Sequence, residues 1–196
     1  VIDLPKDVLN PQIKLPYEYP DTIKMRSYNP TVTGHKGQIK KALKALLEAK
    51  KPVLYVGGGA VISEADQQLI KLAEALNLPV VSTLMGLGAF PGTHKNSLGM
   101  LGMHGTKAAN LVVQESDLLI VVGARFDDRV TGKLDTFAPH AKVIHIDIDA
   151  AEFSKLRLAN APIRGDINKI MPQLELTQDI SSWVHHSEGL RSSFKW

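Results

Sequence analysis

Short apolar segments alternate with helix-like segments along most of this chain, and this alternation constrains its fold more than any other feature. Strands and helices joined by short connections are typical of βαβ units, which build a parallel sheet covered on both faces. We therefore predict an α/β fold, a Rossmann-like doubly wound sheet of six parallel strands with helices on both faces. The predicted strands are residues 52–56, 79–82, 97–100, 117–122, 142–148 and 161–163.

The predicted helices lie between these strands. Residues 35–49 have the apolar spacing of an amphipathic helix that stops before Pro52, with lysines on its outer face. These lysines could instead form a nucleic-acid patch, but no aromatic residue lies among them to stack on bases, so we expect a solvated face and no nucleic-acid partner. Further helices are predicted from a cap at Ser63, over residues 106–115 and over residues 167–174.

Three regions are predicted. Residues 35–175 form a central domain, while the proline-rich residues 1–34 form the end of a preceding domain and an extended linker. Residues 176–196, which include Trp183 and Trp196, are expected to be a linker toward a C-terminal domain and to have no order of their own. The chain starts with valine inside a strand-like phrase, and we interpret it as a domain of a longer protein.

Composition excludes several classes of protein. The absence of cysteine rules out a disulfide scaffold, a thiolate zinc site and a cysteine nucleophile. The longest apolar run, residues 118–122, is far shorter than the roughly 20 residues of a membrane-spanning helix. We therefore expect a cytoplasmic protein without a membrane partner.

Glycine or polar residues follow every predicted strand. Ligands of open α/β sheets bind beyond the carboxyl ends of the strands, so this recurrence predicts one binding edge. The segments concerned are residues 57–59, 83–85, 101–105, 123–130, 147–149 and 165–166.

The glycines after the first strand have two interpretations. They form either a tight turn or a site where backbone amides approach a phosphate. Gly57 and Gly59 fit the start of the dinucleotide fingerprint, but Ile62 stands at its third glycine. Thr83, not an acidic residue, ends the second strand, so an ordinary NAD site is disfavoured.

The charged residues at this edge are also open to two interpretations. Arg125 and Arg129 can contact a phosphate, or they can pair with Asp127 in a loop held by its own salt bridges. Asp147 suits a ribose hydroxyl, whereas Asp149 is more simply a helix cap. His104 has no partner at metal-ligand spacing, so we expect ligand contact there and no metal site. No catalytic motif is present, and these residues predict a nucleotide-cofactor-binding domain without a catalytic residue.

Four phrases of the sequence carry a family resemblance. Residues 1–8 (VIDLPKDV), 84–88 (LMGLG), 100–105 (MLGMHG) and 123–132 (GARFDDRVTG) resemble the catalytic large subunit of the acetohydroxyacid synthase family, also called acetolactate synthases. Members use thiamine diphosphate and Mg²⁺ to condense two pyruvates, or pyruvate with 2-ketobutyrate, with loss of CO₂ in branched-chain amino-acid biosynthesis. The resemblance implies that this chain is the middle of three domains, the one that holds FAD without using its redox chemistry.

The resemblance also implies a set of site residues. Met103, Asp128 and Arg129 would line the channel to the active site, where inhibitors bind. The FAD contacts would be Gly57, Gly58, Thr83, Leu84, Gly102, Met103, His104, Gly123, Arg125, Asp127, Arg129, Val130, Asp147, Ile148 and Asp166.

The family's catalytic glutamate and its GDG motif for Mg²⁺ and diphosphate belong to the other two domains. The chain alone is therefore expected to be inactive, and its parent to work as a homodimer or larger, with a possible regulatory subunit. The alternatives are the middle domain of another thiamine-diphosphate enzyme, a free-standing NAD-binding enzyme, or a structural module with a vestigial groove.

Overall fold

The computed structural model describes residues 3–14, 16, 18–22, 26, 28–174 and 176–194. Val1 and Ile2 of the first family-like phrase, and Trp196, lie outside these ranges. The chain divides into two units, Val1–Pro30 and Thr31–Trp196. The described part of the first unit contains turns, such as the one in which the amides of Val8 and Leu9 donate to the Pro5 carbonyl. The predicted boundary at residue 34 thus lies within four residues of the division.

A six-stranded sheet in the order β3-β2-β1-β4-β5-β6 forms the centre of the second unit, and every neighbouring pair is parallel. This confirms the predicted doubly wound α/β class. The chain leaves β1 in one direction along the sheet and β4 in the other, so the topological switch point lies between these two strands. The strands are β1 Pro52–Val56, β2 Val80–Ser82, β3 Ser97–Met100, β4 Leu118–Val122, β5 Lys142–Asp147 and β6 Ala161–Arg164.

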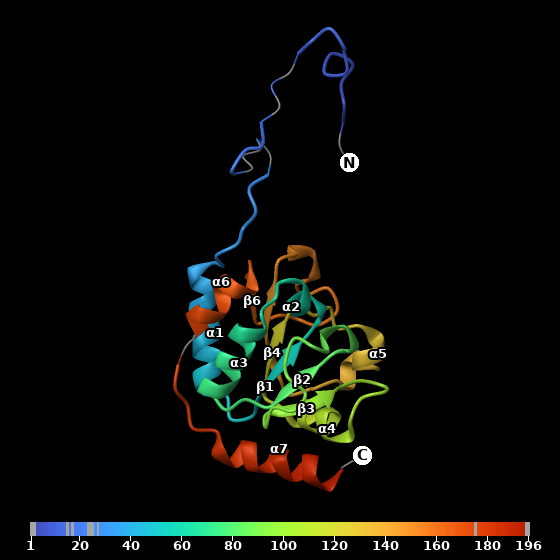
Figure 1. The fold of residues 1–196 in the computed structure, drawn as a ribbon. Coiled ribbons are helices and arrows are strands. Elements are labelled where there is room, and N and C mark those ends of the chain that lie inside the picture. The colour runs from blue at the N-terminus through green and yellow to red at the C-terminus, as the bar shows by residue number, and fades with distance from the viewer. Residues whose placement is uncertain are drawn as a thin grey trace. The chain divides into compact units, whose positions relative to one another are not determined.

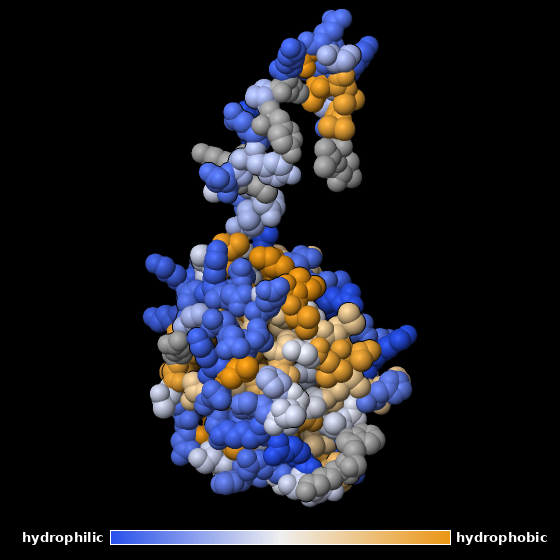
Figure 2. Space-filling view, viewed as in Figure 1, coloured by the Kyte–Doolittle hydropathy of each residue, from blue (hydrophilic) through white to orange (hydrophobic). Residues whose placement is uncertain are grey.

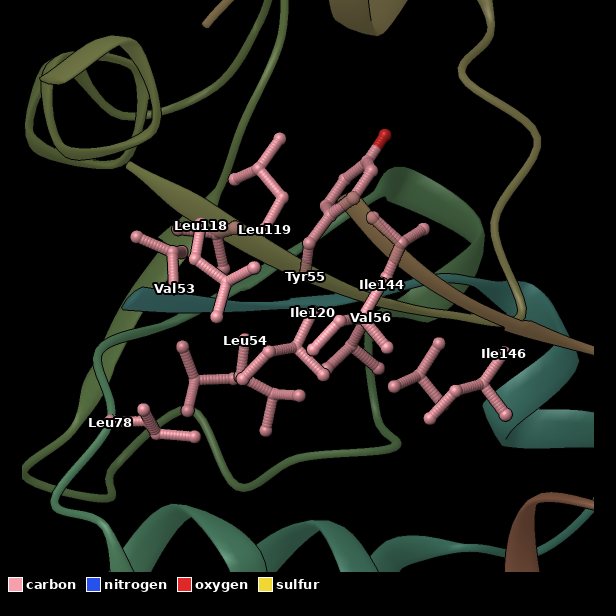
Figure 3. Packing of buried hydrophobic residues seen from close by; sticks show 14 of the residues in the cluster. Val53, Leu54, Tyr55, Val56, Leu78, Leu118, Leu119, Ile120, Ile144 and Ile146 are labelled. Atoms are coloured by element: carbon pink, nitrogen blue, oxygen red, sulfur yellow. The ribbon is translucent and has the colours of Figure 1, made fainter. Parts of the chain in front are cut away.

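Every residue of β1 and β4 is buried, as expected for central strands covered on both faces. Tyr55 and Leu119 point to one side of the sheet, and Leu54 and Ile120 point to the other (Figure 3). The helices are α1 Lys36–Glu48, α2 Gly58–Ile62, α3 Asp66–Ala75, α4 Lys107–Glu115, α5 Asp128–Thr131, α6 Ile167–Ile170 and α7 Ser181–Ser193, with short 3₁₀ turns at η1 Leu84–Gly86, η2 Leu134–Thr136, η3 Ala150–Glu152 and η4 Met171–Leu174. Figure 1 shows α1, α3 and α6 on one side of the sheet and α4 and α5 on the other.

The first helix matches the prediction closely. Ile39, Ala42 and Leu46 of α1 are buried, while its lysines are exposed as a solvated face. The segment after β1 differs from the prediction. Its first turn is already helical as α2, and Ser63 closes α2 by donating to the Gly59 carbonyl (2.9 Å) instead of capping α3.

The end of the chain also differs from the prediction, because residues 181–193 form helix α7 and not an unordered linker. The apolar residues Ile180, Trp183 and Leu190 recur at helical spacing, and Trp183 is only 3% exposed. Its indole N–H donates to the Pro52 carbonyl at the start of β1 (3.0 Å). Helix α7 therefore packs at the amino ends of the strands, opposite the predicted binding edge.

Candidate functional site: a cleft at the carboxyl ends of the strands

A cleft of about 680 Å³ opens at the carboxyl ends of the strands, over the switch point between β1 and β4. Its walls come from the segments that follow β1, β2, β4, β5 and β6, which is the edge that the sequence predicts. The predicted site residues in its lining are Gly58, Thr83, Leu84, Gly123, Arg125, Asp127, Arg129, Val130, Asp147, Ile148 and Asp166.

Other predicted residues stand outside the lining. Met103 and His104 are exposed on the loop after β3, and Asp128 is exposed at the start of α5. Gly102 is buried, and the amide of Met103 donates to the Arg129 carbonyl (2.9 Å), which joins this loop to the segment after β4. The roles given to these residues by resemblance stay predictions.

The glycines after β1 have a packing role. A β-carbon at Gly57 would lie 2.2 Å from the Gly123 carbonyl oxygen, and one at Gly59 would lie 2.8 Å from the Gly123 α-carbon. The turns after β1 and β4 therefore touch backbone to backbone, which only glycine permits. Gly58 differs, because its β-carbon would first meet the side chain of Met85, at 3.0 Å, and not the turn after β4.

The polar residues at the strand ends also cap the short helices that follow. Thr83 Oγ1 accepts from the Gly86 amide (3.0 Å), Asp127 from the Arg129 amide (3.1 Å) and Asp166 from the Asn168 amide (2.8 Å). Asp149 accepts from the Ala151 amide (2.9 Å), which confirms its interpretation as a cap. Each cap uses one acceptor position, so the other lone pairs of these side chains remain available to a ligand.

Arg125 and Arg129 place positive charge along one wall of the cleft. Nη2 of Arg125 and Oδ2 of Asp127 are 3.9 Å apart, and both side chains are exposed. This is a weak surface pair, and it leaves the guanidinium accessible to a ligand. The pKa of Asp127 is lowered mainly by the hydrogen bond from the Arg129 amide, and further by the charges of Arg125 and Arg129. Asp127 is therefore an anion at neutral pH, and its charge lies beside the exposed Arg125 guanidinium.

Aromatic side chains pack beneath this wall. The Phe126 ring contacts Tyr55 on β1 (centroids 5.7 Å apart) and His145 on β5 (5.6 Å). Phe126 has a φ of +58°, an unusual backbone conformation that turns the chain between Arg125 and Asp127. His145 donates its Nε2–H to the Ala124 carbonyl (2.8 Å), because a carbonyl can only accept. The buried floor thus fixes the course of the arginine-bearing loop.

Because His145 lies in this floor, we expect the stability of the protein to depend on pH. Burial lowers its pKa, although the Ala124 hydrogen bond and the charges of Asp147 and Glu152 act in the other direction. The unfolded chain, with a histidine pKa near 6.5, binds the proton first, so we expect the free energy of unfolding to fall as the pH drops below about 6.5, by at most about 1.4 kcal/mol per pH unit. Urea unfolding of the wild type and His145→Gln at pH 7.5 and 5.5 measures this. An equal loss in both proteins would contradict the assignment.

Several lining residues were missed by the sequence analysis. Gly59, Met85, Ala124, Phe126, Asp149 and Gly165 lie within the strand-end segments of the predicted binding edge, but they were not assigned a ligand contact. The lining residues outside these segments carry no motif: Tyr55, Ile62, Ser63, Glu152 and Ile167. Ile62 is 85% exposed and Met85 is 72% exposed, so the rim is apolar. Figure 2 shows hydrophobic side chains at the surface over α2, whereas the surface over α1 and α3 is mainly hydrophilic.

Among the described residues, no three histidine or acidic side chains gather in a way that could hold a metal ion. None of the helices within the described ranges has the length and apolar character needed to cross a membrane.

An open parallel sheet with a cleft at its switch point is the architecture of α/β domains that bind nucleotide cofactors. Comparison with known sequences is more specific: the model of the family "Thiamine pyrophosphate enzyme, central domain" matches residues 39–174. The chain belongs to this family of central domains.

Two related proteins support this assignment. The chain is 55% identical over 192 residues to the acetolactate synthase large subunit of Haemophilus influenzae, covering 93% of the chain and 34% of the relative. It is 58% identical over 174 residues to the acetolactate synthase isozyme 3 large subunit of Escherichia coli K12, covering 89% of the chain and 30% of the relative. The chain therefore spans about a third of the length of these proteins.

Proposed function

We propose that the strand-end cleft binds FAD. The observation that carries this proposal is the position of the cleft over the switch point, where it collects most of the residues that the family resemblance assigns to FAD. Its volume of about 680 Å³ is typical of small-molecule and cofactor sites.

The chemistry of the lining suits such a ligand. Arg125 and Arg129 can donate charge-assisted hydrogen bonds to a diphosphate. Asp147 and Asp166 can accept from ribose or ring donors through the oxygens that their caps leave unused. The apolar side chains of Leu84 and Ile148, both more than half exposed, offer surfaces for the planar rings. FAD would supply the flavin ring, and these residues would hold and orient it.

For the whole protein we propose the activity of the named relatives. The parent would be an acetolactate synthase large subunit that uses thiamine diphosphate and Mg²⁺, held by its other domains, to condense pyruvate with pyruvate or 2-ketobutyrate with loss of CO₂. We further propose a cytoplasmic enzyme that works as a homodimer or larger, with a possible regulatory subunit. The 196-residue chain by itself should form no acetolactate from pyruvate.

A titration separates this proposal from its alternatives. The purified chain is titrated with FAD while flavin fluorescence is followed, and NAD and ADP are added as competitors. Saturable binding that prefers FAD supports the proposal. A preference for NAD would instead indicate a free-standing NAD-binding enzyme, and absence of binding by all three would indicate a structural module.

A further inference from the structure

The hydroxyl group of Tyr55 stands out in the floor of the cleft. Tyr55 belongs to the central strand β1, is 1% exposed and lines the cleft. Figure 3 shows its hydroxyl at the tip of a side chain that points away from Leu54 and Val56. Within the described part of the chain, this buried oxygen has no hydrogen-bond partner.

Packing explains the ring of Tyr55 but not its hydroxyl. The ring lies against Phe126 with centroids 5.7 Å apart, and a phenylalanine could make the same contact. A buried hydroxyl without a partner has lost its hydrogen bonds to water and destabilises the fold. The fold alone would therefore be served better by phenylalanine at this position.

The surroundings show which chemistry the hydroxyl meets. Burial, and then the negative charge of Asp127, raise the pKa of Tyr55 above its ordinary value, so the phenol keeps its proton and can donate it. Asp127 is already held by the Arg129 amide and stands 3.9 Å from the Arg125 guanidinium. The hydroxyl thus lies beneath the loop that carries the donors for an oxygen-rich ligand.

We propose that Tyr55 is a ligand-binding residue whose hydroxyl donates a hydrogen bond to an oxygen atom of the dinucleotide in the cleft. This inference rests on the proposed function and adds to it a contact that the family resemblance does not include. The unpartnered hydroxyl destabilises the ligand-free protein, and a hydrogen bond to the ligand removes this destabilisation. An ordered water molecule beneath Phe126 is the competing occupant.

The test compares Tyr55→Phe with Tyr28→Phe, which removes the same atom from a side chain that is 61% exposed. Melting temperature without ligand and dissociation constants for FAD and ADP are measured for both variants and the wild type. We expect Tyr55→Phe to raise the ligand-free melting temperature by about 2–4 °C. We also expect it to weaken FAD binding about 3- to 10-fold, while Tyr28→Phe changes neither. Equal weakening of ADP binding would assign the contact to the ADP half of the ligand, and unchanged ADP binding would assign it to the flavin half.

The wild-type titration reports on the proposed function, and the ratio of variant to wild type reports on Tyr55. If the wild type binds FAD and Tyr55→Phe binds it equally well, this inference is overturned and the proposed function stands. A lower melting temperature for ligand-free Tyr55→Phe also overturns it, because the hydroxyl would then be satisfied by internal water. If the wild type binds neither FAD nor ADP, both proposals fail.

Discussion

Replacement of Gly57 by alanine is expected to disrupt the turn after β1 and with it the cleft. The new methyl group would lie 2.2 Å from the Gly123 carbonyl oxygen and 2.5 Å from the Ala124 β-carbon. Both neighbours belong to the chain that continues β4, so neither can move aside as a flexible side chain could. We expect a loss of about 3 kcal/mol or more in the free energy of unfolding, at the upper end of the cost of overpacking, measured by urea denaturation.

Gly92→Ala is the matched control. A β-carbon at Gly92 has no atom within 4 Å, and its φ lies outside the range that strains other residues. This variant should unfold within about 1 kcal/mol of the wild type. If Gly57→Ala were as stable as Gly92→Ala and still bound FAD, the backbone contact between the two turns could not be the reason for glycine at position 57.

Replacement of Arg125 by alanine is expected to weaken FAD binding about 10- to 150-fold, the effect of losing a charge-assisted hydrogen bond. The side chain is 71% exposed and its pair with Asp127 is long, so the fold should lose little stability. Dissociation constants from flavin fluorescence and the melting temperature of each protein measure both effects. Arg125→Lys should fall in between, because it keeps the charge but not the planar pair of donors.

Lys44→Ala controls for the change in net charge. Lys44 is 78% exposed on α1 and forms only a long surface pair with Glu48 (3.7 Å). If Arg125→Ala weakened FAD binding no more than Lys44→Ala, the phosphate would have to be placed away from the loop after β4.

The sheet was predictable from the sequence because its two central strands have a clear apolar pattern. Residues 52–56 and 118–122 are unbroken apolar runs bounded by polar or glycine residues, and both strands are fully buried. Helix α2 was not predicted, since it begins with two glycines that disfavour helix in isolation. Its place is fixed by the close approach to Gly123, a contact between segments far apart in the sequence.

Helix α7 was missed for a related reason. Ile180, Trp183 and Leu190 recur at helical spacing, but the serines and histidines around them are more typical of a linker. Trp183 gives the segment its place by donating to the Pro52 carbonyl, and the His186 ring stacks on the indole (centroids 5.5 Å apart). Pro52 lies far away along the chain, so the local sequence does not show that the segment is held against the sheet.

The edge of the cleft was predictable from topology, whereas its floor was not. The carboxyl ends of all strands in a parallel sheet lie at the same edge, so residues such as Thr83, Arg125 and Asp147 could be grouped from the sequence alone. Tyr55 looks like an ordinary core residue in the strand pattern. Only the three-dimensional arrangement shows that its hydroxyl is buried without a partner among the described residues.

Amide hydrogen exchange with and without FAD tests the central claim most directly, because it shows where the ligand binds. We expect FAD to slow exchange in residues 57–62, 83–87 and 123–131, which surround the cleft. Helix α7, at the opposite ends of the strands, should exchange at the same rate in both states. Protection confined to α7, or binding that leaves exchange in the cleft segments unchanged, would contradict the assignment of the cleft as the FAD site.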